Sequence, residues 1–216
     1  MTFVGVTWNM QRQDNSTFEY KIRLRACALI ELKTAPVIME THGGFGAIFA
    51  RCYRDYQEGV VFDHDADRVD FLAKQRPTWA VYQADSITAL RLGVGSHLTV
   101  NFLDCDPYGE VWPTLKAFFY PNQRPRAGRM AVVINDGLGQ FTRIGKAWES
   151  HSLAAMVKQY GNAAIDKRYL EISKELFQEI ITPLSYRITR WTAYRCGHKK
   201  EMTHWAAIIE RKEHGQ

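Results

Sequence analysis

The chain has 216 residues, which fits one α/β domain, and its 46% of hydrophobic residues suffice for one core. The 28 basic and 23 acidic residues give a net charge of +5 and a pI near 9.0, which favours weak attraction to polyanions and excludes a histone-like charge. No apolar run is long enough for a signal peptide or for the roughly 20 residues of a membrane span. The four cysteines have no paired spacing and lie in apolar or strand-like stretches, so we expect buried, reduced thiols in a cytoplasmic protein.

The N-terminal part of the chain changes from irregular to helical. Residues 1–15 are polar, and their pattern fits either a segment over a binding cleft or a frayed end. From the candidate N-cap Ser16, apolar residues recur at helical spacing and predict an amphipathic helix. Its expected apolar face consists of Phe18, Ile22, Ala26, Leu29 and Ile30. The other face carries Lys21, Arg23 and Arg25, which we interpret as solvated, with phosphate contact as the alternative.

Five short apolar runs follow, and the first four end in carboxylates. They are residues 37–39 before Glu40, 59–63 ending at Asp63, 79–85 ending at Asp85, 98–109 with Asp104 and Asp106, and 130–134. Helical patterns separate the runs, at residues 47–56, 65–74, 86–92 and 112–120. This alternation predicts a mostly parallel, Rossmann-like α/β sheet with helices on both faces, because each right-handed crossover between parallel strands needs a covering helix.

The C-terminal part of the chain is less regular at first. Residues 137–166 are rich in glycine and mixed charges, and we interpret them as a variable cap over the cleft with one helix near residues 153–160. A helical pattern returns at residues 167–181. Residues 186–194 and 203–211 are rich in β-formers and predict an antiparallel hairpin at the sheet edge. We therefore expect a single domain over all 216 residues.

A glycine-rich turn follows the first strand, with the sequence His42-Gly43-Gly44-Phe45-Gly46. Glycines allow a tight turn and a close approach of the backbone to a ligand. Such a turn alone is equally typical of a helix packed closely on a sheet. Asp63, however, follows at about the 20-residue distance at which dinucleotide-binding folds place a carboxylate on a ribose hydroxyl.

The order and spacing of these motifs resemble the class I S-adenosylmethionine-dependent methyltransferases over roughly residues 18–136. The motif Asp106-Pro107-Tyr108-Gly109 is similar to the Asp-Pro-Phe-Gly of the tRNA guanine dimethyltransferases and to the Asn/Asp-Pro-Pro-Tyr of enzymes that methylate exocyclic amines. The loop departs from the family pattern acid-x-Gly-x-Gly-x-Gly, because His42 stands at the first glycine position and Gly43 is an additional glycine.

The resemblance implies S-adenosylmethionine (SAM) as the cofactor. Glu40 would lie near its methionine amino group and Asp63 on its ribose. Asp85 would accept from the adenine amino group, with Ser86 able to donate nearby. Taken singly, each of these acids could instead cap the helix that follows its strand. The full set of expected cofactor-binding residues is Glu40, His42, Gly43, Gly44, Gly46, Asp63, His64, Asp85, Ser86 and Asp104.

The resemblance also implies that Asp106, Pro107 and Tyr108 are catalytic. The Asp106 carboxylate and the Pro107 carbonyl would accept the two protons of an amine and turn its lone pair toward the methyl group. Tyr108 would stack on a flat base, although a core aromatic at a turn has the same pattern. Asp104 shares the side of its strand with Asp106 and could support it rather than react.

The expected partner is a nucleic acid, either RNA or DNA, as the methylated substrate. The basic and aromatic hairpin could contact it or could simply be an edge strand protected by charges; the residues are Arg187, Arg190, Trp191, Tyr194, Arg195, Lys199 and Lys200. The alternatives are a non-catalytic cofactor-binding protein and a methyltransferase for protein or small molecules. Cys196, His198 and His204 could touch a metal, but they lack a fourth ligand, so no metal site is expected.

Overall fold

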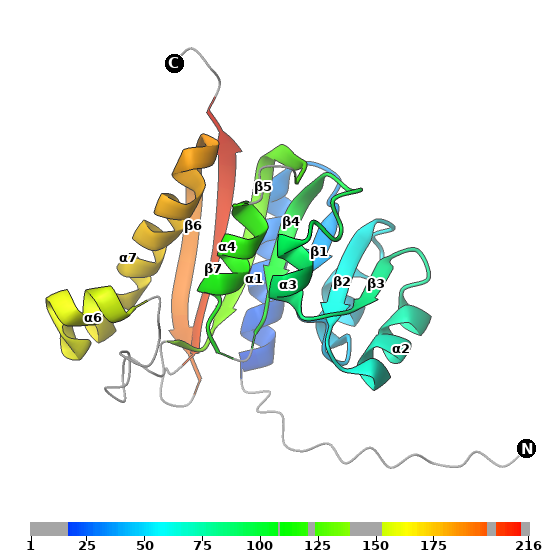
Figure 1. The fold of residues 1–216 in the computed structure, drawn as a ribbon, viewed down its shortest axis with the longest axis horizontal. Helices are drawn as coiled ribbons and strands as arrows, with labels where there is room; N and C mark the ends of the chain where they lie inside the picture. Colours follow the sequence, from blue (N-terminus) through cyan, green and yellow to red (C-terminus); the bar gives the residue numbers. More distant parts are fainter. Residues whose placement is uncertain (1–16, 108, 121–123, 139–152, 198–201, 213–216) are drawn as a thin grey trace, which may run out of the picture.

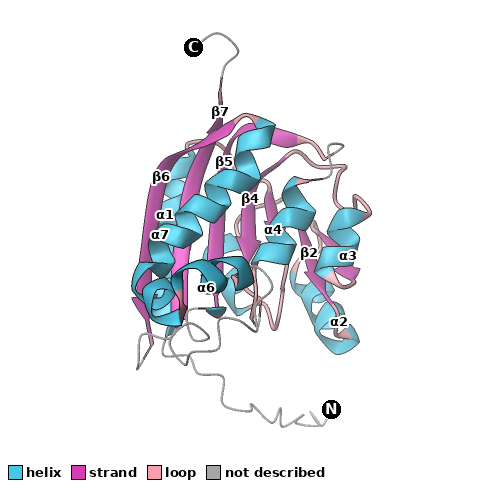
Figure 2. Cartoon of the chain, turned by 60° about the vertical axis from the view of Figure 1, so that its left-hand side comes forward, coloured by secondary structure: helices cyan, strands magenta, loops and turns pink. Residues whose placement is uncertain are grey.

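The computed structural model describes residues 17–107, 109–120, 124–138, 153–197 and 202–212. They form a seven-stranded sheet in the order β3-β2-β1-β4-β5-β7-β6, covered by helices on both faces (Figures 1 and 2). The parallel strands are β1 (Ile38–Glu40), β2 (Gly59–Asp63), β3 (Ala80–Gln83), β4 (Val100–Cys105) and β5 (Arg126–Asp136). The antiparallel hairpin consists of β6 (Tyr186–Cys196) and β7 (Met202–Arg211), with β6 at the edge. The predicted Rossmann-like fold is confirmed.

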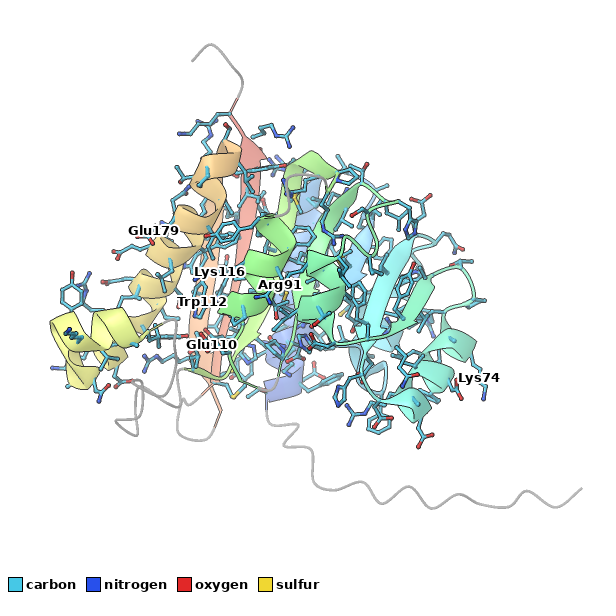
Figure 3. The ribbon with its side chains drawn as sticks, viewed as in Figure 1. Lys74, Arg91, Glu110, Trp112, Lys116 and Glu179 are labelled. Atoms are coloured by element: carbon cyan, nitrogen blue, oxygen red, sulfur yellow. The ribbon has the colours of Figure 1, made fainter. Side chains whose placement is uncertain are left out.

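Two hydrophobic cores lie on the two faces of the sheet. One contains residues of α3 (Ser86–Arg91), α4 (Trp112–Phe119) and α7 (Asn162–Ile181). The other contains residues of α1 (Phe18–Leu32), the π-helical turn η2 (Phe49–Tyr53) and α2 (Ala66–Gln75). Two short helices, α6 (Ala154–Tyr160) and η4 (Thr182–Leu184), flank α7. Polar side chains such as Lys74 and Glu179 lie on the outer faces of the helices (Figure 3).

Strand β5 shows how the sequence pattern divides the two cores. Met130, Val132 and Ile134 belong to the core under α4 and α7, whereas Ala131 and Val133 belong to the core under α1. All five side chains are fully buried. A strand that is covered on both faces needs a continuous apolar run, and this is why the fifth run lacks polar alternation.

The predicted apolar face of α1 is partly wrong. Ala26 and Ile30 are exposed, whereas Leu24, Arg25 and Ala28 are buried. The helix is rotated relative to the prediction because the Arg25 guanidinium has a carboxylate partner in the core and therefore does not need water. Helical periodicity alone places an arginine on the solvent face.

The cysteine prediction is correct in part. All four thiols are free, and Cys105 and Cys196 are buried, but Cys27 is exposed on α1 and Cys52 is partly exposed. No helix in the described part of the chain is long and apolar enough to cross a membrane. The expected cap falls largely on residues 139–152, which lie outside the described residues, so the cap and the single domain stay predictions.

Candidate active site

The carboxyl ends of the parallel strands form a wall with two adjoining pockets. The first has a cavity volume of about 180 Å³, and the second has about 80 Å³. Both are lined by His42, Asp63 and His64. The first is also lined by Thr17, Phe18, Lys21, Glu40, Gly43, Gly44, Phe45, Ala47, Ile48, Arg68 and Asp106. The second is also lined by Thr41, Ala84, Asp85 and Ser86. In open parallel sheets this edge is where ligands bind.

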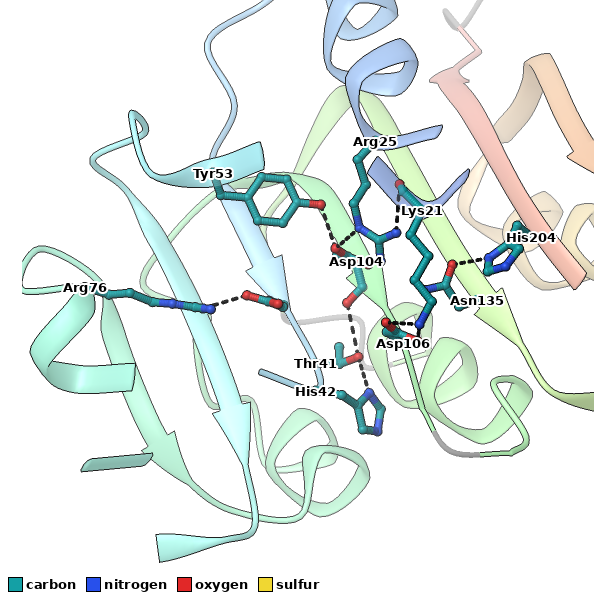
Figure 4. Close-up of polar contacts among 11 residues, drawn as sticks. Lys21, Arg25, Thr41, His42, Tyr53, Arg76, Asp104, Asp106, Asn135 and His204 are labelled. Carbon is teal, nitrogen blue, oxygen red and sulfur yellow. Dashed lines mark hydrogen bonds and ion pairs between the residues drawn. The ribbon is translucent and has the colours of Figure 1, made fainter. Parts of the chain in front are cut away.

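Asp106 lies in the first pocket, directly after β4, and is paired with Lys21 of α1. The Lys21 ammonium donates to both carboxylate oxygens of Asp106, at 2.9 and 2.8 Å (Figure 4). Burial raises the pKa of Asp106, but the charges of Lys21 and Arg25 outweigh burial, and the net pKa is lowered. Asp106 is therefore an ionised hydrogen-bond acceptor at neutral pH, and it still has 23% of its side-chain surface exposed.

Asp104, in contrast to Asp106, is buried and enclosed by its hydrogen-bond partners. Its carboxylate accepts two hydrogen bonds from Arg25, from Nε at 2.7 Å and from Nη2 at 2.6 Å, and a third from the Tyr53 hydroxyl at 2.6 Å. Arg25 and Asp104 are both buried. Asp104 does not line either pocket. This geometry favours the supporting role that the sequence left open, in which Asp104 fixes α1 over the ends of the strands.

Glu40, at the end of β1, lines the first pocket and also forms a buried ion pair. The Arg76 Nη1 atom donates to Glu40 Oε2 at 2.6 Å, and the Arg76 guanidinium lies over the rings of Phe49 and Trp79. Burial raises the pKa of Glu40 to about 7, although the Arg76 guanidinium opposes that shift. The ion pair occupies one carboxylate oxygen, so the other oxygen is the acceptor that Glu40 can offer to a cation in the pocket.

The glycine loop is held by Asp63 at the end of β2. Asp63 accepts from the backbone N–H of Gly44 at 2.8 Å and from that of Asp65 at 3.0 Å. Gly44 has φ +53°, and a Cβ there would meet nothing within 4 Å, so its backbone faces open space. At Gly43 a Cβ would approach side-chain atoms of Leu72 and Val61 to 2.5 and 2.6 Å. The added glycine of the loop is thus required by packing, and the next one leaves room for a ligand.

The second pocket contains His42, Ser86 and Asp85. His42 Nδ1 lies 2.8 Å from Thr41 Oγ1, and Nε2 lies 3.5 Å from Ser86 Oγ. Burial lowers the pKa of His42, although the surrounding acids oppose this. Asp85 accepts from the Thr88 N–H at 2.8 Å and is the N-cap of α3, and this hydrogen bonding lowers its pKa. Asp85 therefore has the capping role that we considered for such acids, and it also lines the pocket.

Most of the predicted site residues meet at this edge. Eight of the expected cofactor residues line the two pockets: Glu40, His42, Gly43, Gly44, Asp63, His64, Asp85 and Ser86. Gly46 and Asp104 lie behind the wall, and Pro107 is half-buried without lining either pocket. Tyr108 lies outside the described residues.

The sequence analysis missed the cations that accompany the acids. Arg76 and Tyr53 did not feature as functional residues, and Lys21 and Arg25 were assigned to a solvated or phosphate-binding face. The structure corrects the assignment of Lys21 and Arg25, since both side chains pair with carboxylates of the chain. The only available signal was the four-residue spacing of Lys21 and Arg25 on a helix that precedes acidic strand ends. Among the described residues, no group of three His, Cys, Asp or Glu side chains could hold a metal.

The fold is shared with methyltransferases of known structure. The N-methyltransferase NodS from Bradyrhizobium japonicum WM9 is similar with a TM-score of 0.57 at 9% identity, over 93% of this chain and 100% of NodS. The plantazolicin methyltransferase BpumL, solved in complex with SAH, gives 0.58 at 9% identity over 92% and 86%. Trm1 from Pyrococcus horikoshii, solved with S-adenosyl-L-methionine, gives 0.62 at 10% identity, over 91% of this chain and 55% of Trm1.

These similarities define the fold as that of the class I SAM-dependent methyltransferases. Neither a protein-family model nor a curated protein sequence matches the chain.

Proposed function

We propose that the chain is a SAM-dependent methyltransferase that methylates an exocyclic amino nitrogen of a nucleobase in RNA or DNA. The observation that carries this proposal is the position of the ionised Asp106 in the wall of the same pocket as Glu40 and the glycine loop. Such a carboxylate is the acceptor that an amine substrate needs beside a cofactor site. We also propose that the enzyme acts in the cytoplasm, which agrees with the four free cysteines.

The residues of the two pockets fit the cofactor. Glu40 would accept from its ammonium group, and Asp63 would accept from its ribose hydroxyls. His42 and Ser86 would line the adenine side, in the second pocket. The open space at Gly44 supports this fit, because the backbone there can approach a ligand without steric conflict. When bound, the cofactor supplies an electrophilic methyl group on its sulfonium centre.

Asp106 and Pro107 would then orient the substrate. An exocyclic amine is a poor nucleophile because its lone pair is delocalised into the base. Two acceptors, the Asp106 carboxylate and the Pro107 carbonyl, would bind its two N–H groups and favour the geometry in which the lone pair points at the methyl group. Tyr108 remains the predicted stacking residue for the base.

We predict that S-adenosylhomocysteine (SAH) raises the melting temperature. A ligand at 100 times its Kd stabilises the folded state by about 2.7 kcal/mol, which corresponds to about 5–10 °C for a domain of this size. Asp63→Ala should reduce this shift, because the paired ribose contacts are lost. Asp65→Ala is the matched control, since Asp65 caps α2 without lining a pocket. Differential scanning fluorimetry measures both; an unshifted wild type at millimolar SAH would refute the cofactor assignment.

The nucleic-acid substrate rests on the net charge of +5 and on the Asp-Pro-Tyr-Gly motif. Two of the proposed phosphate contacts pair with acids of the chain instead: Arg190 with Glu31 at 2.6 Å and Arg195 with Asp166 at 2.9 Å. Lys199 and Lys200 lie outside the described residues and stay the predicted phosphate contacts of the hairpin.

We predict that binding to a nucleic acid falls steeply with salt. For roughly three to five phosphate contacts, the slope of log affinity against log salt should be about −2 to −4, because condensed counterions are released. Lys199→Gln should flatten the slope by about one unit, whereas the control Arg190→Gln should leave it unchanged. Fluorescence anisotropy with tRNA, single-stranded DNA and duplex DNA tests this. An absence of binding at low salt would favour a protein or small-molecule substrate instead.

A further inference from the structure

A row of polar side chains crosses the sheet at the edge where Asp106 lies. Asn135 of β5 is paired with His204 of β7, and His204 is paired with Tyr194 of β6. Asp106 follows the last pair of β4 with β5, Cys105 with Ile134, and so lies beside Asn135. Figure 4 shows Asn135 between Asp106 and His204. The row therefore continues the candidate site across three further strands.

These polar residues adjoin an apolar part of the sheet. Two residues away on the same two strands, the paired Val133 and Ala206 belong to the hydrophobic core under α1. Side chains two apart share a face, so Asn135 and His204 are covered by α1 as well. Both are buried. Burying an amide and an imidazole costs free energy unless their polar atoms are paired, so their orientations must be tightly determined.

The orientation of the Asn135 amide follows from its neighbours. Its Oδ1 atom lies 2.5 Å from His204 Nδ1. Its Nδ2 atom has no hydrogen-bond partner among the described residues, and the strand register places Asn135 between His204 and Asp106 (Figure 4). An ionised carboxylate only accepts, so the NH2 group must face Asp106 and the oxygen must face His204.

The tautomer of His204 is then determined too. The groups that face its ring are Asn135 of β5, Tyr194 of β6, Lys21 and Arg25 of α1, and Asp106. Burial and Lys21 lower the pKa of His204 to about 4, although Asp106 opposes this shift, so the ring is neutral and has one N–H. That proton must be on Nδ1, because otherwise two acceptors, His204 Nδ1 and Asn135 Oδ1, would face each other. The buried Nε2 atom, which has no hydrogen-bond partner in the described part of the chain, is then the acceptor nitrogen of the ring.

We propose that Asn135 and His204 are positioning residues for Asp106, with His204 donating from Nδ1 to Asn135 Oδ1 and so directing the Asn135 NH2 group at the carboxylate. This inference rests on the proposed function only for its catalytic consequence. A carboxylate offers about four lone-pair sites. Lys21 uses one on each oxygen and the Asn135 NH2 group would take a third, which would leave one acceptor site on Asp106 for one N–H of the substrate.

The structural part of the proposal is tested without a substrate. Long-range 1H–15N correlation spectra of the 15N-labelled protein should show His204 as the neutral Nδ1–H tautomer from pH 6 to 8, with the signal assigned through His204→Gln. Asn135→Leu should shift the tautomer toward Nε2–H. A wild-type Nε2–H tautomer, or no change in Asn135→Leu, would overturn the proposal.

The link to Asp106 is tested by its carboxyl titration in 13C spectra. Asn135→Leu and His204→Leu should each raise the midpoint, and the double variant should raise it no further than one single variant, since both act through one contact. Val133→Ala is the matched control, because it removes buried volume from the same face without a polar group. An unchanged midpoint in both single variants would contradict the proposal.

The catalytic consequence is measured by methyl transfer to bulk tRNA and DNA. Asn135→Leu and His204→Leu should each lower kcat about tenfold, the effect of one hydrogen bond to a charged group, with SAH affinity unchanged. His204→Gln should restore part of the rate, because its amide can donate to Asn135. Unchanged kcat in an active wild type would refute the positioning role. An inactive wild type would refute the proposed function alone, because the tautomer and the carboxyl titration still test the positions of Asn135 and His204.

Discussion

Replacing Asp106 with alanine should abolish methyl transfer while SAH affinity stays within a few-fold of the wild type. The carboxylate is assigned to the substrate nitrogen, and losing one such preorganised charged acceptor costs about a hundredfold or more in kcat. The fold should tolerate the change, since the unpaired Lys21 ammonium already has 21% of its side chain exposed and can turn to water. Transfer of a labelled methyl group from SAM to bulk tRNA and DNA gives the rate, and calorimetry with SAH gives the affinity.

Two further variants test whether the loss of activity comes from the charge of Asp106, from its shape, or from removing any acid. Asp106→Asn keeps the volume but removes the charge, so it should lose nearly as much activity as alanine. Asp67→Ala removes an exposed acid of α2 that does not line either pocket and should leave both quantities unchanged. A parallel loss of SAH binding in Asp106→Ala would instead assign the carboxylate to the cofactor.

Arg25→Met should destabilise the protein by about 3–5 kcal/mol, because it leaves the buried Asp104 carboxylate without its cation. For a domain of this size the melting temperature should fall by about 6–20 °C. Tyr53 would still donate one hydrogen bond, but a neutral donor cannot replace the charge. Urea unfolding followed by circular dichroism measures the loss.

The double variant Arg25→Met with Asp104→Leu should recover most of this stability, since well-packed apolar residues often replace a buried ion pair without cost. The exposed pair of Arg190 with Glu31 is the control, and Arg190→Met should change stability by less than about 1 kcal/mol. If Arg25→Met were as mild as the control, the buried pair would not hold α1 on the sheet.

Three buried or half-buried ion pairs lie at the strand ends. Arg76 comes from the C-terminal end of α2, whereas Arg25 and Lys21 come from α1, and they pair with Glu40, Asp104 and Asp106, respectively. Burial disfavours the charged form of a carboxylate and so raises its pKa. At Asp106 the nearby cations outweigh burial and lower the pKa, so this carboxylate of the first pocket can accept hydrogen bonds. At Glu40 burial outweighs Arg76 and raises the pKa to about 7.

The sequence by itself determined the fold and the edge of the sheet at which the candidate residues meet. Apolar runs that end in acids at Glu40, Asp63 and Asp104 are local patterns, and the topology of a parallel sheet brings such ends to one edge. The glycine turn and the terminal hairpin are equally local, because they depend on backbone preferences of neighbouring residues. These features were therefore predicted correctly from residues close together in the chain.

Only the tertiary structure decided which acid lines a pocket and which acid is enclosed by an ion pair. Lys21 and Asp106 are 85 residues apart, and Arg25 and Asp104 are 79 apart, so no local pattern indicates that they pair. A prediction from periodicity places a charged residue toward water, since burying an unpaired charge is very costly. Such a prediction takes no account of a partner on a distant strand. The same holds for Asn135 and His204, which became neighbours of Asp106 only through the register of three strands. Long-range pairing of charge and hydrogen bonds, rather than local pattern, separates the acid that faces the pocket from the acid that holds the helix.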